Sequence, residues 1–130
     1  VKEECHIKFR DLDINLDDID TVVLSHGHYD HAGGLKDFIE SRDDKINIIC
    51  HPLSFNKKKK GNSNMGAPYR KDEIIKLANV NFSDKPVKVS KNITYLGQIP
   101  YIMDFENRKL MMTILWTIRL YYTTQVMEYI

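Results

Sequence analysis

The chain has 130 residues and a mass of 15.2 kDa, the size of one small domain or of a piece of a larger one. Hydrophobic residues make up 42% of it, which is enough for a packed core and excludes a wholly disordered chain. The 19 basic and 18 acidic residues leave a formal net charge of +1, so no global field favours nucleic acid or an anionic membrane.

The cysteines and the first residues indicate a cytoplasmic protein. Cys5 and Cys50 are too few for a disulfide scaffold and suggest a reducing compartment. No apolar signal region follows Val1, so secretion is unsupported. Val1 is also not a methionine, and we expect the natural chain to begin upstream of it.

Residues 15–50 predict the alternating elements of a layered α/β domain. The β-branched and apolar run at 21–25 predicts a buried strand, followed by a glycine-rich loop. Leu35, Phe38 and Ile39 recur at helical spacing and predict a helix over about residues 33–42. A second buried strand is expected at 46–50, and this order of strand, helix and strand is typical of a parallel sheet.

The second part of the chain is less regular. Residues 54–70 predict a surface loop that carries four consecutive lysines, 57–60. A solvated loop is favoured for them over a phosphate or nucleic-acid contact, because no aromatic residues interleave the lysines. A short helix is expected from Lys71, and weak strands are expected around 80–82, 87–89 and 93–96.

Four metal-binding side chains lie within six residues, directly after the first predicted strand. His26, His28, Asp30 and His31 form the pattern His-x-His-x-Asp-His. The first two rings can turn toward one point, and the Asp-His pair beyond the bend can face a second one. Imidazole and carboxylate suit zinc, iron(II) or manganese. Two such ions about 3.5–4 Å apart can hold a hydroxide and clamp a carbonyl or phosphoryl oxygen, which predicts a hydrolytic centre.

Residues 22–35, VVLSHGHYDHAGGL, resemble the signature of the metallo-β-lactamase-fold hydrolases. Tyr29 and the AGGL run resemble one subgroup, which contains uncharacterised bacterial metallohydrolases and the archaeal enzyme that joins a dihydropterin to a ribosyl-aminobenzene phosphate. The later segments His51-Pro52, Gly97-Gln98-Ile99-Pro100 and Asp104-Phe105-Glu106 also resemble this subgroup. The resemblance covers roughly residues 12–109.

The resemblance implies an α/β fold, part of a metallo-β-lactamase-type αββα sandwich. It implies that His26 and His28 hold a first metal, and Asp30 and His31 a second. Asp30 would also be the catalytic residue that orients the attacking water when only one metal is bound. One or two zinc ions are implied, with iron or manganese as alternatives. A metal-bound hydroxide would then hydrolyse a small-molecule substrate, with no nucleic acid or membrane as partner.

The sequence also departs from the family. Members supply further metal ligands downstream of this motif, but the chain has no histidine after His51. We therefore expect residues 1–109 to form a partial domain with an incomplete metal shell. A non-catalytic gene remnant and a small binding module are the alternatives, so whether this chain is an enzyme stays open.

Several single residues have two interpretations. His51 is expected to be structural or substrate-facing rather than a ligand, because it follows a strand and precedes a proline. Tyr29 either lines the substrate mouth or packs. Residues 66–68 resemble a turn near the active-site opening. Cys50 is expected in the core and His6 on the surface.

Residues 110–130 differ in character from the rest of the chain. They hold three of the five methionines, and Arg119, Gln125 and Glu128 disfavour a membrane span. A shifted reading frame joins the last base of each codon to the first two bases of the next. In this frame, aspartate is encoded by the pairs Met-Met and Met-Thr at 111–113 and by Trp-Thr at 116–117, whichever synonymous codons are used. We hypothesise a frameshift near residue 110, with frame regained near residue 120; a core helix or strand pair is the alternative. Resequencing the locus tests this.

Overall fold

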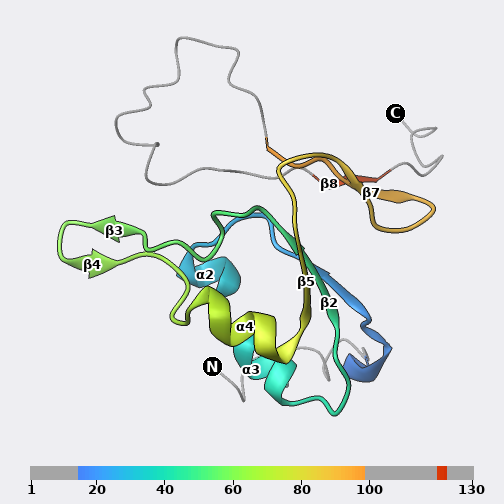
Figure 1. The fold of residues 1–130 in the computed structure, drawn as a ribbon, viewed down its shortest axis with the longest axis horizontal. Helices are drawn as coiled ribbons and strands as arrows, with labels where there is room; N and C mark the ends of the chain where they lie inside the picture. Colours follow the sequence, from blue (N-terminus) through green and yellow to red (C-terminus); the bar gives the residue numbers. More distant parts are fainter. Residues whose placement is uncertain (1–14, 99–119, 123–130) are drawn as a thin grey trace, which may run out of the picture.

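The computed structural model describes residues 15–98 and 120–122 of the chain (Figure 1). Several sequence-based expectations concern residues outside these ranges. They are the surface position of His6, the family-like segments at 99–100 and 104–106, and most of the tail from residue 110.

A three-stranded parallel sheet lies at the centre of the fold, in the order β1 (Thr21–Val23), β2 (Asn47–Cys50) and β5 (Asn79–Phe82). In its register, Val22 lies opposite Ile48, and Ile48 lies opposite Val80. The runs at 21–25 and 46–50 predicted buried strands and residues 80–82 a weak one, and the structure confirms a strand in each place with slightly different ends. Only β2 is mostly buried, because β1 is half-buried and β5 alternates between exposed and half-buried residues. Each parallel step needs a crossover, which the chain makes through helices.

Four short helical segments accompany this sheet: η1 (Leu16–Asp18), α2 (Tyr29–Ala32), α3 (Leu35–Glu40) and α4 (Lys71–Leu77). Helix α4 is confirmed at its predicted start. The single helix predicted over 33–42 is wrong in its boundaries, because a helical turn already begins at Tyr29 and Gly33-Gly34 separate it from α3. The second half of the histidine motif therefore lies on a helix and not in a loop.

Helices α3 and α4 cover one face of the central sheet (Figure 1). Lys36 on α3 donates to Glu73 on α4 over 2.7 Å, so the two helices lie side by side. Cys50 is fully buried, as expected. The core under the helices contains Leu35, Phe38, Ile39, Ile48, Cys50 and Ile74.

A second, antiparallel sheet covers the opposite face. It consists of β6 (Val87–Lys88), β7 (Ile93–Tyr95) and β8 (Leu120–Tyr122), which confirms the strands predicted around 87–89 and 93–96. Ile49 packs on Tyr95 with Val23, Val87 and Val89 around them. Because neighbouring residues of a strand point to opposite faces, Ile48 faces the helices and Ile49 faces the second sheet. A helix layer and two sheets make up three layers of an αββα sandwich.

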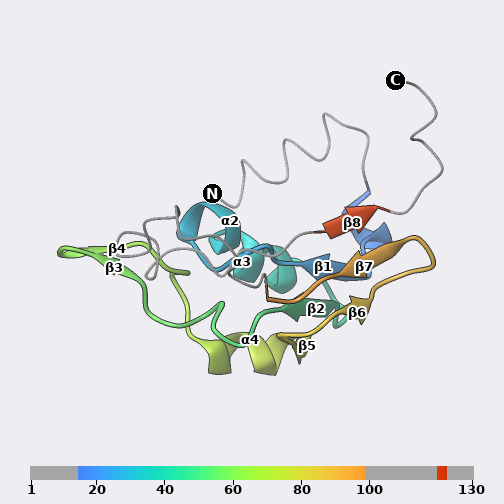
Figure 2. The same cartoon turned by 90° about the horizontal axis from the view of Figure 1, so that it is seen from above.

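The loop predicted over 54–70 is in part a β-hairpin, formed by β3 (Lys59–Lys60) and β4 (Ser63–Asn64). Gly61 turns the chain there with a φ of 60°, which glycine adopts readily. Figures 1 and 2 both place this hairpin at the opposite end of the fold from the second sheet. No helix in the described part of the chain is long and apolar enough to cross a membrane.

Candidate metal centre

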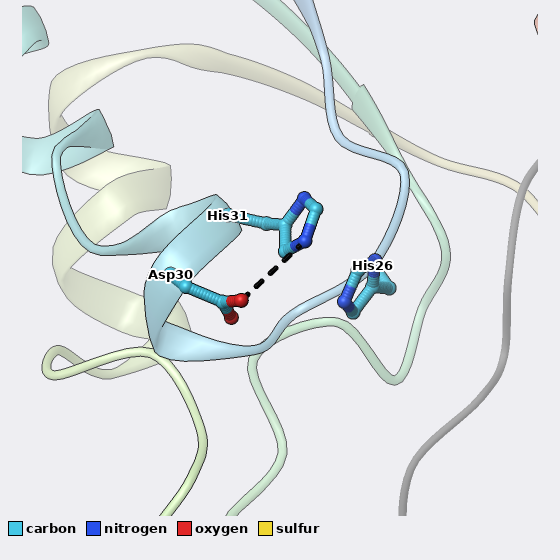
Figure 3. Close-up of side chains that lie close together, drawn as sticks. All are labelled: His26, Asp30 and His31. Carbon is cyan, nitrogen blue, oxygen red and sulfur yellow. Dashed lines mark ion pairs between the residues drawn. The ribbon is translucent and has the colours of Figure 1, made fainter.

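The histidine motif begins where the chain leaves the carboxyl end of β1. His26 lies in the loop, His28 directly precedes α2, and Asp30 and His31 lie within that helix. One short helical turn therefore carries the carboxylate and the last imidazole back toward the loop (Figure 3).

The structure brings His26, Asp30 and His31 together. Their ligand atoms all lie within 4.8 Å of one another, so these three residues could hold a metal ion. Nε2 of His31 lies 3.6 Å from Oδ2 of Asp30, and the ring centroids of His26 and His31 are 4.0 Å apart (Figure 3). The donors are two imidazoles and one carboxylate, a set that suits zinc, iron(II) or manganese.

His28 lies beside this group but is not part of it. Its ring meets that of His26 edge-on, with centroids 4.8 Å apart, and only 9% of the residue is exposed. The expected pairing of His26 with His28 for one metal and of Asp30 with His31 for another therefore stays a prediction. In the structure His26 groups with the second pair.

The electrostatic surroundings favour neutral rings in the loop. Burial, followed by the nearby rings of His31 and His28, lowers the pKa of His26. Burial and then the ammonium of Lys58 lower the pKa of His28. Neutral imidazole is the form that binds a metal ion, so these shifts reduce the competition from protons.

A second segment, residues 65–67, holds the histidine loop in place. The Tyr29 N–H donates to the Met65 carbonyl over 3.0 Å, and the Ala67 N–H donates to the Gly27 carbonyl over 3.1 Å. His28 and Gly66 form an antiparallel bridge between these two bonds. The turn predicted at 66–68 thus lies against the metal-binding loop.

Lys58 holds the turn formed by residues 53–56, a role that sequence reasoning missed. Its ammonium is buried and donates to the carbonyls of Leu53, Ser54 and Asn56 at 3.1, 2.9 and 3.2 Å. Burial lowers the pKa of Lys58. The expectation that all four lysines are solvated is therefore wrong for Lys58. In the sequence, only the nearby turn with Leu53 and Phe55 could have distinguished Lys58 from the other three lysines.

Two further residues have clearer positions. His51 is 4% exposed, lies outside the His26 group, and its Nδ1 accepts from the Leu53 N–H at 3.2 Å, a contact that orders the turn after β2. The side chain of Tyr29 is not packed in a core, because the residue is 54% exposed beside Asp30.

Comparison with known proteins identifies the family. The model of the metallo-beta-lactamase superfamily matches residues 3–97. The chain belongs to the metallo-beta-lactamase superfamily. A solved metal-dependent hydrolase of the beta-lactamase superfamily has the same fold, with a TM-score of 0.56 and 28% sequence identity over 71% of this chain and 33% of its own.

Two relatives come from Methanocaldococcus jannaschii. An uncharacterized protein is 39% identical over 90 residues, 67% of this chain and 34% of its own length. The 7,8-dihydropterin-6-methyl-4-(beta-D-ribofuranosyl)-aminobenzene-5'-phosphate synthase is 43% identical over 44 residues, 34% of this chain and 15% of the synthase. The resemblance to that subgroup is thereby confirmed. The chain spans about a third of the first relative and of the solved structure.

Proposed function

We propose that this chain carries the first part of the metal centre of a metal-dependent hydrolase. His26, His28, Asp30 and His31 would hold one or two divalent ions, with zinc first and iron or manganese as alternatives. The observation that carries the proposal is the convergence of His26, Asp30 and His31 within 4.8 Å at the end of β1. Their imidazole nitrogens and carboxylate oxygen are donor atoms that such ions bind.

A divalent ion in this place would lower the pKa of a coordinated water and polarise the oxygen of a carbonyl or phosphoryl substrate. The chain's own residues would do the rest. The Asp30 carboxylate is exposed and can accept a hydrogen bond from the attacking water, which orients it. Tyr29 is exposed beside it, where it can contact a small-molecule substrate at the mouth of the site.

The proposed shell is only part of what the chemistry needs. The chain has no histidine after His51, and His51 lies outside the group. We therefore propose that residues 1–109 are one partial domain of the sandwich and that residues 110–130 are an off-pattern tail. Turnover would then be slow or absent in these residues alone, while metal binding would persist.

Metal binding by the purified chain tests the proposal. We expect zinc to bind the wild-type chain, and His26→Ala and Asp30→Ala to weaken binding about 10-fold or more, because each removes a donor. Asp43→Ala is the matched control, since it removes an exposed carboxylate away from the motif. The measurement is zinc content after dialysis, with affinity from competition with a chelator.

Two results would contradict the proposal. One is equal zinc affinity in the wild-type chain and His26→Ala. The other is a wild-type chain that binds no zinc and takes up a dye specific for exposed apolar surface, which would support a non-catalytic remnant instead.

A further inference from the structure

Ser25 lies between β1 and the first metal-binding histidine, and its hydroxyl meets two rings at once. Oγ of Ser25 is 3.0 Å from Nδ1 of His26 and 3.5 Å from Nδ1 of His31. One ring belongs to the loop and the other to α2. A single hydroxyl thus connects two proposed ligands that stand on different elements.

The two nitrogens of the His31 ring face different partners. On His31, Nε2 faces the Asp30 carboxylate at 3.6 Å, inside the group of possible ligands. The Nδ1 side of the same ring faces the serine. A neutral imidazole carries one N–H and one lone pair, so the nitrogen that meets Ser25 decides which nitrogen is left to bind a metal.

Only one arrangement leaves both rings with a free Nε2 lone pair. A serine oxygen has two lone pairs and can accept from two donors. When both Nδ1–H groups donate to Oγ, both Nε2 atoms are free as ligands. When the hydroxyl instead donates to one Nδ1, that ring carries its hydrogen on Nε2, and this Nε2 can no longer bind a metal.

We propose that Ser25 is a positioning residue that accepts from Nδ1 of both His26 and His31 and so holds both rings as Nε2 ligands. This inference rests on the proposed metal centre. It also explains how two ligands on separate elements keep one orientation, because the shared acceptor fixes both rings relative to the end of β1. Partners of this kind commonly change metal affinity 10–100-fold when they are removed.

Nitrogen NMR of the metal-free full chain tests the tautomers directly. In the wild-type chain we expect His26 and His31 to carry their hydrogen on Nδ1, and Ser25→Ala to mix the two tautomers in both rings. Ser25→Thr, which keeps the hydroxyl, is expected to restore the wild-type pattern. A merely structural serine would not change which ring nitrogen carries the hydrogen.

Zinc affinity provides the second measurement. We expect Ser25→Ala to weaken zinc binding about 10-fold or more and Ser25→Thr to stay near the wild-type value. Ser41→Ala is the matched control, because Oγ of Ser41 donates to the Phe38 carbonyl at the end of α3 and touches no proposed ligand. Its zinc affinity should equal that of the wild-type chain.

The outcomes separate this inference from the proposed function. Wild-type zinc affinity in Ser25→Ala would overturn the role of Ser25 and leave the metal centre standing. A hydrogen on Nε2 of His26 or His31 in the wild-type chain would overturn it as well, even if Ser25→Ala does not fold. Failure of the wild-type chain to bind zinc would overturn the metal centre and, with it, this inference.

Discussion

At the scale of single residues, Gly27 is the glycine of the described part of the chain that leaves the least space for a side chain. It lies between His26 and His28, and a Cβ built on it would be 1.6 Å from the carbonyl oxygen of Ser54. That oxygen belongs to the backbone turn that Lys58 holds, so it cannot move aside as a side chain would. We expect Gly27→Ala to destabilise the fold by about 1–3 kcal/mol and to weaken zinc binding. Urea unfolding measures the first effect and chelator competition the second.

Gly34→Ala is the control for this substitution. Gly34 has a φ of −82°, and a Cβ there meets no atom within 4 Å. Alanine fits this conformation and restricts the unfolded chain, so stability should stay equal or rise by about 0.4–1 kcal/mol. If Gly27→Ala behaves like Gly34→Ala, the close approach of the two loops is not what fixes the histidines.

At the scale of elements, an ion pair joins the two helices that cover the central sheet. The Glu73 carboxylate accepts from Lys36 on α3 at 2.7 Å and from the Arg70 N–H at the start of α4 at 2.8 Å. These two bonds hold the pKa of Glu73 below its ordinary value, and the bond to Glu73 raises the pKa of Lys36. The pair therefore stabilises the fold only while both groups are charged.

This pair predicts a pH-dependent effect of Glu73→Gln on stability. A depressed carboxyl pKa contributes stability above the unfolded-state value, and that contribution is lost as the pH falls through the folded pKa. The raised pKa of Lys36 sets the upper end of the pH range in which the pair stabilises the fold. The contribution of Lys36 is lost as the pH rises through this pKa. We expect Glu73→Gln to lower the melting temperature at pH 7 and the difference to shrink in acid.

A double-mutant cycle is the control for the helix pair. In a Lys36→Met background, Glu73→Gln should have a smaller effect at pH 7, because its partner is already gone. An equal effect in both backgrounds would mean that Glu73 acts only through the Arg70 N–H at the start of α4.

At the scale of the whole molecule, Tyr95 joins the two sheets. Its side chain is fully buried against Ile49, and its hydroxyl donates to the Ser83 carbonyl at 2.8 Å. We expect Tyr95→Ala to cost about 3–5 kcal/mol, because it removes the largest side chain between the sheets. Tyr95→Phe should cost about 1 kcal/mol, the value of the lost hydrogen bond. Urea unfolding followed by circular dichroism compares them.

Comparing the stability lost in Tyr95→Ala with that lost in Tyr95→Phe shows how much the packing of the second sheet on the first contributes to stability. A small and equal cost for both substitutions would show that the second sheet is not packed on the first in solution. The hypothesis that a frameshift precedes residues 120–122 stays a prediction, although these residues do pair with β7 as a strand.

The sequence by itself determined the local elements and the chemistry. Short β-branched runs predicted strands 21–25 and 46–50 because such residues pack on both faces of a covered sheet. The spacing of His26, His28, Asp30 and His31 indicated metal binding and the superfamily, because ligand type and spacing are properties of a short segment.

Only the tertiary structure decided which of these side chains meet and what supports them. The grouping of His26 with Asp30 and His31 depends on the helical turn that begins at Tyr29. The approach of residues 65–67 to the histidine loop depends on contacts between segments far apart in the chain. Hydrophobic periodicity reports which face of one element is buried, but not which loop closes over it. The physical reason is that these contacts form only when the sheet, the helices and the loops pack together.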